Sequence, residues 1–148
     1  MDFSSSSPVV AAALLSLAGL AHGADTSAEF VVMGANSSQG TMRAMLCTEK
    51  ERFPNGCRLS ARAPARVEGS RLVFANLPPG RYAFSVVHDE DDSGRLGISR
   101  ISGKPKGIGF SNNVTGPGGV PTFNLAAIDV KDAEFKQVVK LRSFGFAR

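Results

Sequence analysis

The feature that most limits the possible folds of this chain is a two-residue alternation of apolar and polar side chains. It is clearest over residues 58–67, where arginines, serine and proline separate the apolar positions Leu59, Ala61, Ala63, Ala65 and Val67. Successive side chains of a strand point to opposite faces of a sheet, so the pattern predicts a half-buried strand with a charged outer face. Pro64 has no N–H to donate, and we therefore expect this strand at a sheet edge, or with that position facing solvent.

Six further short runs have strand-like composition, and turn-forming residues separate most of them. These runs are residues 29–33, 41–47, 71–75, 81–88, 126–130 and 135–141. Seven short strands with turns between them predict an all-β fold in the form of a β-sandwich. Outside the first 23 residues, no window has the periodicity of an amphipathic helix.

The strand spacing fails over residues 89–123, which hold eight glycines and three prolines. A segment of this length without regular structure is usually either functional or disordered. Its larger apolar residues argue against disorder, because a solvated linker would not carry them. They are Ile98, Ile101, Ile108, Phe110 and Phe123. We expect one long, ordered, glycine-rich loop that folds back and is pinned by these side chains.

Residues 1–23 have the pattern of an export signal, which leaves residues 24–148 of this 148-residue chain as a single domain. An apolar run from Pro8 to Ala21 precedes the small-x-small sequence 21–23, and the run is too short to span a bilayer comfortably. The residues before the run carry no Lys or Arg, which is unusual for such a signal. We expect an exported protein, periplasmic or secreted, with no membrane span.

The charge of the chain is moderately basic. Its formal value of +4 becomes +5 without residues 1–23, because Asp2 is the only charged residue in that segment. A basic chain can bind nucleic acid or an anionic membrane surface. Here the arginines occur singly rather than in a basic stripe, and we therefore expect no nucleic-acid partner.

The mature part contains two cysteines, Cys47 and Cys57. An even count in an exported chain predicts a disulfide. The intervening residues 53–56, Phe-Pro-Asn-Gly, supply turn chemistry that can bring the two thiols together. The alternative is a metal site, but the spacing is not CxxC and no histidine lies nearby in the sequence.

The acidic segment 88–94, His-Asp-Glu-Asp-Asp-Ser-Gly, directly follows a predicted strand. Asp89, Asp91 and Ser93 reproduce the oxygen ligands at positions 1, 3 and 5 of a calcium-binding loop, and a glycine follows at position 6. Position 12, where a calcium loop has glutamate, is Arg100. A calcium site would therefore need oxygens from elsewhere, such as Asn112, Asn113 or backbone carbonyls.

Two other interpretations of the acidic segment remain open. The favoured one is a solvated turn whose charge keeps the end of a sheet soluble, with carboxylates that pair weakly with Arg95 or Arg100. The other is a surface that recognises a basic or hydroxyl-bearing ligand.

His88 ends the predicted strand beside Asp89. It would be the general base of a hydrolase if Ser111 or Ser93 were its nucleophile. The sequence contains neither a nucleophile-elbow pattern nor an identifiable oxyanion motif. We therefore favour a structural histidine that ties the strand end to the long loop by hydrogen bonds.

Four motifs of the chain are similar to a known family. Residues 88–96, 107–113 (Gly-Ile-Gly-Phe-Ser-Asn-Asn), 121–123 and 77–82 resemble exported bacterial proteins of the domain of unknown function 2141 family. The likeness covers about residues 30–141. That family usually has Asp after Lys-Leu where this chain has Gly after Arg-Leu, which counts further against a metal role for the loop.

The resemblance implies an exported β-sandwich like prealbumin or carboxypeptidase-regulatory modules, and it implies no known activity. The expected fold is thus an all-β, seven-stranded, immunoglobulin/prealbumin-like β-sandwich with one long ordered Gly-rich loop. The expected protein is a non-enzymatic monomer without a cofactor. We expect it to bind an unknown envelope component or small ligand, or to support the cell envelope, through loops 88–95 and 107–123.

The predicted ligand-binding residues are His88, Asp89, Asp91, Ser93, Ser111, Asn112 and Asn113. A calcium-stabilised adhesion or carbohydrate-binding module, with Asp89, Asp91 and Ser93 on the metal, is the first alternative function. A small hydrolase that uses His88 is the second.

Overall fold

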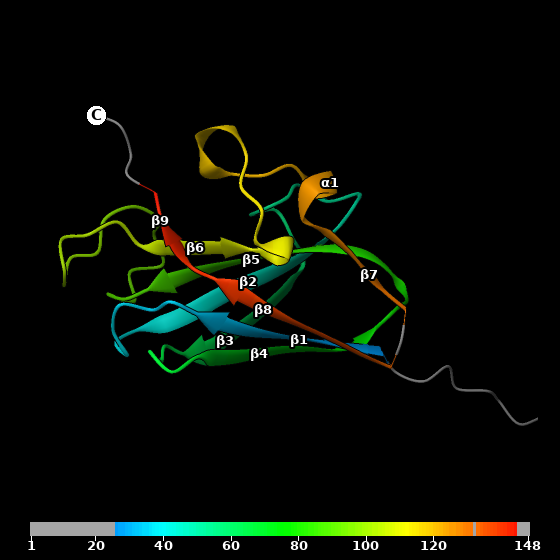
Figure 1. Cartoon of the computed structure of the whole chain (residues 1–148), viewed down its shortest axis with the longest axis horizontal. Coiled ribbons are helices and arrows are strands. Elements are labelled where there is room, and N and C mark those ends of the chain that lie inside the picture. Colours follow the sequence, from blue (N-terminus) through cyan, green and yellow to red (C-terminus); the bar gives the residue numbers. More distant parts are fainter. Residues whose placement is uncertain (1–25, 132, 145–148) are drawn as a thin grey trace, which may run out of the picture.

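The computed structural model describes residues 26–131 and 133–144, and this part of the chain forms nine strands in two sheets. Figure 1 shows the two sheets as layers, with loops gathered at their ends. The predicted export signal, residues 1–23, and Asp132 of a predicted turn lie outside the described residues. Within the described ranges, no helix has the length and apolar character that crossing a membrane requires.

The smaller sheet has three strands in the order β4 (Ser70–Leu77), β1 (Thr26–Met33) and β8 (Glu134–Lys140). Strand β1 is antiparallel to β4 and parallel to β8. Buried and partly exposed residues alternate along the whole of β1. This two-residue period is the signature of a strand with one face on the core.

The larger sheet has six strands. Its main order is β3 (Leu59–Pro64), β2 (Thr41–Thr48), β5 (Gly80–Asp89), β6 (Gly107–Phe110) and β9 (Arg142–Ser143), and β7 (Ala127–Val130) pairs with the first half of β5. Three short helical turns follow β6: η1 (Ser111–Asn113), η2 (Pro117–Gly119) and α1 (Phe123–Ala126). Strand β5 is the centre of this sheet, because it pairs with β2 on one side and with both β6 and β7 on the other.

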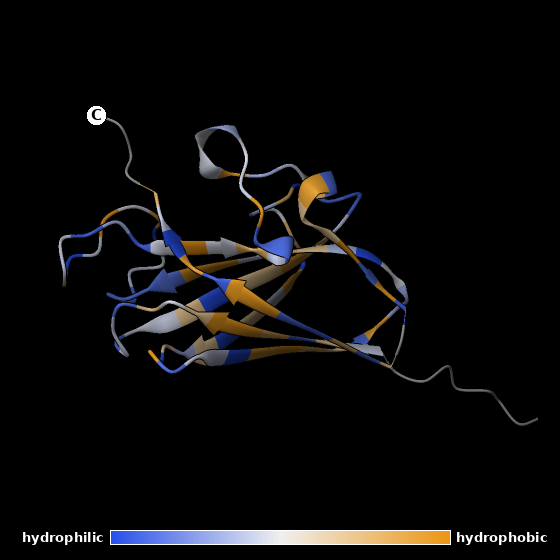
Figure 2. Ribbon diagram, viewed as in Figure 1, coloured by the Kyte–Doolittle hydropathy of each residue, from blue (hydrophilic) through white to orange (hydrophobic). Residues whose placement is uncertain are grey.

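The core lies between the two sheets. Phe30 of β1 stacks on Phe84 of β5 with ring centroids 3.9 Å apart, and Phe74 of β4 meets the same Phe84 edge to face at 6.2 Å, so aromatic contacts join the layers. Figure 2 shows hydrophobic stretches on strands of both sheets. The larger members of this cluster are Phe30, Val32, Met42, Leu46, Leu72, Phe74, Leu77, Tyr82, Phe84, Val86, Ile128, Val130 and Val139. Burial of such side chains is the main favourable term in folding.

A second apolar cluster covers the opposite face of the larger sheet. Phe110 pairs with Ser85, the neighbour of the core residue Phe84, and therefore points away from the core. Its ring lies 5.9 Å from that of Phe53, which in turn lies 6.3 Å from Phe123. The turn after β2 and the helix α1 are thus packed onto this outer face.

All seven strands that the sequence predicts are present, within a few residues of their predicted bounds. The all-β prediction is therefore confirmed, but the count of seven is wrong for the described chain, because β6 and β9 add two short strands. The finer immunoglobulin/prealbumin assignment stays a prediction. Strand β3 lies at a sheet edge and ends at Pro64, as expected from the missing N–H.

The predicted long loop, 89–123, contains more regular structure than its glycine content suggests. It includes β6, two helical turns and an isolated bridge between Ile98 and Pro105. Phe110 is buried, as predicted, but Ile98 and Ile101 are 54% and 57% exposed. The expectation that these two isoleucines pin the loop is therefore wrong, and polar contacts hold that part of it instead.

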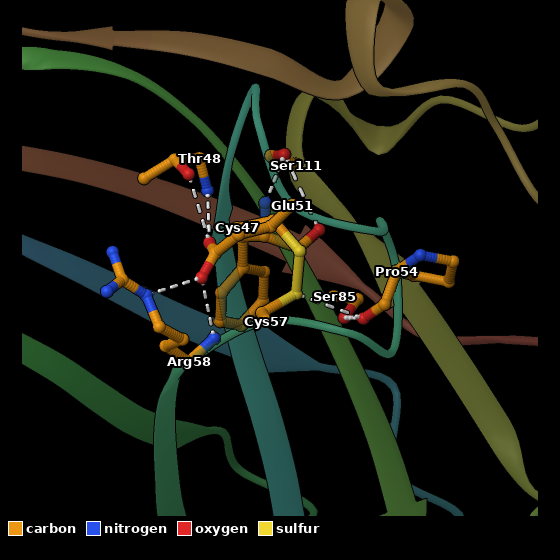
Figure 3. The surroundings of a disulfide bond; sticks show 9 residues. Cys47, Thr48, Glu51, Pro54, Cys57, Arg58, Ser85 and Ser111 are labelled. Carbon is orange, nitrogen blue, oxygen red and sulfur yellow. Dashed lines mark hydrogen bonds and ion pairs between the residues drawn. A yellow bond between two sulfur atoms is a disulfide. The ribbon is translucent and has the colours of Figure 1, made fainter.

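Cys47 and Cys57 form the predicted disulfide, which closes the turn after β2 (Figure 3). The Glu51 carboxylate organises the same turn, because it accepts hydrogen bonds from the backbone N–H groups of Thr48 at 2.8 Å and Arg58 at 3.0 Å. The hydrogen bond from Thr48 is the largest cause that lowers the pKa of Glu51. The disulfide and this carboxylate together fix the turn that covers the outer face.

We predict that replacement of both cysteines by serine lowers the free energy of unfolding by about 3 kcal/mol, because a loop of ten residues loses its covalent closure. Urea denaturation of the oxidised protein and of the double variant measures the difference. The reduced wild-type protein is the control and should match the variant. Equal stability of oxidised protein and variant would contradict the prediction.

Candidate functional site

The register of β5 and β6 brings the acidic segment together with a lysine. Val87 pairs with Ile108 in this antiparallel ladder. Asp89, two residues after Val87, ends β5, and Lys106, two residues before Ile108, directly precedes β6. The same register therefore places Asp89 opposite Lys106. The loop between them leaves and returns at the same end of the larger sheet (Figure 1, left).

Lys106 is the centre of the polar contacts at this end. Its ammonium lies 2.7 Å from Asp89 Oδ1, 2.6 Å from Asp91 Oδ1 and 2.7 Å from Ser93 Oγ. It also donates to the backbone oxygen of Arg95 at 2.6 Å. The side chains of Lys106 and Asp89 are each only 1% exposed. A buried ammonium surrounded by oxygens in this way has its charge and its hydrogen bonds satisfied.

The second oxygen of each carboxylate is also occupied. Asp89 Oδ2 accepts from Arg43 Nε of β2 at 2.7 Å and from the N–H of Gly94 at 2.8 Å. Asp91 Oδ2 accepts from the N–H of Arg100 at 2.8 Å. The three predicted calcium ligands therefore do converge on one point, but the cation at that point is the lysine.

The contacts keep this cluster ionised. Burial by itself would lower the pKa of Lys106, but its hydrogen bonds to Asp89 and Asp91 outweigh burial and raise that pKa. Burial would raise the pKa of Asp89, yet hydrogen bonds from Lys106 and Gly94 hold it below its ordinary value. The hydrogen bond from Lys106 is likewise the largest cause that lowers the pKa of Asp91. At neutral pH the cluster is a set of charged pairs.

Glu90 ties the same loop to two other segments. Its Oε1 accepts from the Ser37 hydroxyl at 2.7 Å, and its Oε2 accepts from the hydroxyls of Ser99 at 2.6 Å and Ser102 at 2.5 Å. The hydroxyl of Ser102, followed by those of Ser99 and Ser37, lowers the pKa of Glu90 to about 2. The carboxylate therefore fastens the turn between β1 and β2 to the long loop.

His88 contacts the same β1–β2 turn. Its Nε2 lies 2.8 Å from the backbone oxygen of Gln39, and the side chain is buried. The neighbouring Gly40 has φ +77°, and a Cβ there would lie 2.1 Å from the backbone oxygen of Asp89. Only glycine permits this approach. His88 thus holds the strand end against the β1–β2 turn, not against the long loop as the sequence predicts.

Ser111, Asn112 and Asn113 lie at the other end of β6, where they join the two sheets. The Ser111 hydroxyl is fully buried, accepts from Phe84 N at 3.0 Å and donates to Ala126 O. Asn112 Nδ2 donates to Ala127 O at 2.9 Å. Asn112 and Asn113 have φ values of +60° and +52°, a conformation that asparagine tolerates better than most residues.

The side-chain amide of Asn113 pairs with the backbone at the edge of β8, as the backbone of a neighbouring strand would. Its Nδ2 donates to Val138 O at 3.0 Å, and its Oδ1 accepts from Lys140 N at 2.8 Å. Asn112 and Gln137 exchange two further hydrogen bonds across the same junction, of 2.8 and 3.1 Å. We call residues 111–113 the sheet clasp, because they connect the larger sheet to β8 of the smaller one.

The structure thus separates the predicted site residues into two groups. His88, Asp89, Asp91 and Ser93 lie at one end of β6, and the sheet clasp lies at the other. Ser111 is opposite Phe84, four residues before His88, which is about 13 Å along a strand. Loops 88–95 and 107–123 therefore do not form the single binding face that the sequence predicts. His88 and Ser111 are also too far apart to act as the base and nucleophile of the hydrolase alternative.

Two features of the site escaped the sequence analysis. Nothing in the composition distinguishes Lys106 from Lys104, since only the β5–β6 register shows which lysine is opposite Asp89. The other feature is the tip loop, defined here as residues 95–104. It exposes Leu96 (59%), Ile98 (54%) and Ile101 (57%) beside a hollow of about 350 Å³. The residues that line this hollow are Asp91, Ser93, Arg95, Leu96, Ile98 and Arg100.

We predict that Asn113→Ala lowers the free energy of unfolding by about 1–3 kcal/mol, because it removes two hydrogen bonds and forces alanine into a left-handed conformation. Asn113→Gly is the matched variant, since it loses the same hydrogen bonds but tolerates the positive φ. Chemical denaturation should rank wild type above Asn113→Gly and Asn113→Gly above Asn113→Ala. An alanine variant as stable as wild type would argue against the clasp.

Glu90 provides a prediction about acid stability. Its pKa is about 2 in the folded protein, against an ordinary value of 4.5, so the stability that it contributes is complete above about pH 4.5. This stability is lost as the pH falls towards 2. Urea denaturation at several pH values should show a steeper loss for wild type than for Glu90→Gln in this window. Parallel curves for the two proteins would contradict the role of the carboxylate.

Comparison with known proteins gives one family. No curated protein and no solved structure matches the chain. Residues 31–138 match the model of a family described as an uncharacterized protein conserved in bacteria, domain of unknown function 2141. The match includes the acidic segment, Lys106, the tip loop and the sheet clasp. The chain therefore belongs to the domain of unknown function 2141 family.

Proposed function

We propose that the protein is an exported, non-enzymatic binding module of the cell envelope that contacts its partner through the tip loop. The observation that carries this proposal is the exposure of three large aliphatic side chains, Leu96, Ile98 and Ile101, within six residues. Exposed apolar groups that gather in this way mark surfaces for protein or membrane contact. The tip loop is also held in place by the rest of the protein, because Lys106 binds the backbone oxygen of Arg95 and Glu90 binds the hydroxyls of Ser99 and Ser102.

The partner that best fits the tip loop is an anionic lipid surface. Arg95, Arg100 and Lys104 are exposed among the aliphatic residues, whereas the one exposed acidic residue beside them is Asp92. Aliphatic side chains can enter the boundary of the acyl chains while the basic groups stay with anionic headgroups. A small soluble ligand would use less of this surface.

The disulfide supports an exported protein. Such bonds persist in oxidising compartments and are rare in the cytosol, and Cys47–Cys57 closes the turn that covers the larger sheet. Export would place the tip loop among the lipids of the envelope. An immunoglobulin/prealbumin-like topology would suit this role, since such sandwiches present their binding loops at one end.

The other functions have less support. Carbohydrate-binding modules stack sugars on exposed aromatic rings, but every aromatic side chain of the described residues is buried or half-buried. The calcium-stabilised module would need the position that Lys106 occupies. The tip loop shares only Arg95 with the predicted binding loop 88–95. Asp89, Asp91 and Ser93 of that loop bind Lys106, and the sheet clasp likewise uses its polar side chains within the protein.

Sedimentation with lipid vesicles tests the proposal. Residues 24–148, which contain both sheets and the described core, are mixed with vesicles of phosphatidylglycerol and phosphatidylcholine or of phosphatidylcholine alone. We expect binding to the anionic vesicles that weakens as salt is raised. The double variant Leu96→Ser/Ile101→Ser should bind at least about tenfold more weakly, because each side chain loses more than about 1 kcal/mol of apolar burial.

Two further variants complete the test. Val120→Ser/Leu125→Ser removes two aliphatic groups of similar exposure, 47% and 50%, outside the tip loop, and should bind as wild type does. Arg95→Gln/Lys104→Gln should lose the preference for anionic vesicles. If wild type sediments equally with both vesicles, or with neither, an anionic lipid surface is not the partner.

A further inference from the structure

We propose that Lys106 is a built-in substitute for a divalent cation, around which the acidic loop folds without any metal. Removal of its side chain would then leave a cage that takes calcium. This inference concerns how the loop is formed and is independent of what the tip loop binds.

The oxygens around Lys106 come from the sequence positions that bind the ion in a calcium-binding loop. Counted from Asp89, the four oxygens around the Lys106 ammonium come from positions 1, 3, 5 and 7, and that of position 7 is the backbone carbonyl of Arg95. A calcium-binding loop takes its ligands from these same positions, with a backbone carbonyl at 7. The glycine that such a loop has at position 6 is Gly94, with φ +70°.

The cage, defined as the four oxygens around the Lys106 ammonium, is close in size to a calcium site. The four oxygens lie 2.6–2.7 Å from the nitrogen, only slightly further than the 2.3–2.6 Å of calcium ligands. An ammonium group has three N–H donors, so these four oxygens surround it as they would surround an ion rather than as three separate partners.

The cation and the oxygens around it come from different segments of the chain. Lys106 belongs to the segment that enters β6, whereas the oxygens belong to residues 89–95. The ammonium therefore arrives from outside the loop that encloses it, as a metal ion would. Two cations, Lys106 and Arg43, already face the two carboxylates of Asp89 and Asp91. Arg100 adds a third at Asp91, with a side chain that is 76% exposed. A divalent ion added beside the lysine would leave an excess of positive charge in a buried site.

The missing ligands of a calcium loop agree with this assignment. Position 12 is Arg100, whose N–H and Nε bind Asp91 Oδ2, and it supplies no carboxylate. Water would complete the shell of a calcium ion in the vacated cage, because calcium needs six to eight oxygens. We therefore expect moderate rather than tight calcium affinity once the lysine side chain is removed.

Thermal unfolding in EDTA, in 5 mM calcium and in 5 mM magnesium tests the proposal. Wild type should have the same Tm in all three. Lys106→Ala should have a lower Tm in EDTA, and calcium should raise it by at least about 5 °C through binding to the folded state. Magnesium should act less, because it demands a tighter octahedral shell.

Matched variants separate the cage from general effects of charge. Lys104→Ala removes an exposed lysine two residues away and should not respond to calcium. Lys106→Ala/Asp91→Asn loses one cage carboxylate and should lose the calcium response of Lys106→Ala. If Lys106→Ala is unfolded in EDTA, recovery of the folded state by calcium supports the proposal in the same way.

Two results would overturn the inference. One is a wild-type protein whose Tm rises by several degrees with calcium, since the lysine would then not fill the site. The other is a Lys106→Ala protein that calcium neither stabilises nor refolds, with no heat of calcium binding in calorimetric titration.

Discussion

The antiparallel ladder between β5 and β6 is the constraint on which both ends of this molecule depend. Its register places Lys106 opposite Asp89 at one end and Ser111 opposite Phe84 at the other. A shift of one residue would turn every side chain of the four-residue strand β6 to the other face of the sheet. The contacts of Lys106 with the acidic segment and those of the sheet clasp therefore both follow from a single strand pairing, although they differ in chemistry and in role.

The charged end shows how a loop without an apolar anchor can still be held in place. Each charge buried there is costly to bring out of water, and the cost is offset only when every carboxylate oxygen and every ammonium proton has a partner. Among the described residues, no buried side-chain polar atom of this protein lacks one. The loop can thus expose Leu96, Ile98 and Ile101 to solvent, because these residues are not needed to hold it.

The sequence predicted the sheets well and the site only in part. Alternation located seven strands because burial of one face leaves a two-residue period. Strands β6 and β9 are too short to show that period. The favoured interpretation of the acidic segment as a solvated turn is wrong for Asp89, whose side chain is only 1% exposed. Convergence of Asp89, Asp91 and Ser93 on a cation belongs to the calcium alternative. The sequence does not identify Lys106 as that cation, because its pairing depends on contacts between distant residues. The sequence predicts Asn112 and Asn113 as ligand-binding residues, because an amide that is free to bind a ligand and one that is hydrogen-bonded within the protein look alike in a sequence.

The parallel pairing of β1 with β8 has a consequence for the route by which the chain reaches its native state. The first strand of the described chain has one neighbour that follows within fifty residues and another that is more than a hundred residues away. Until the last part of the polypeptide has been delivered, one edge of β1 keeps open backbone donors and acceptors, which invite pairing with another molecule. Contacts so distant along the chain are also slow to form. Closure of the smaller sheet is therefore a late step, because it has to wait until residues 134–140 can pair with β1.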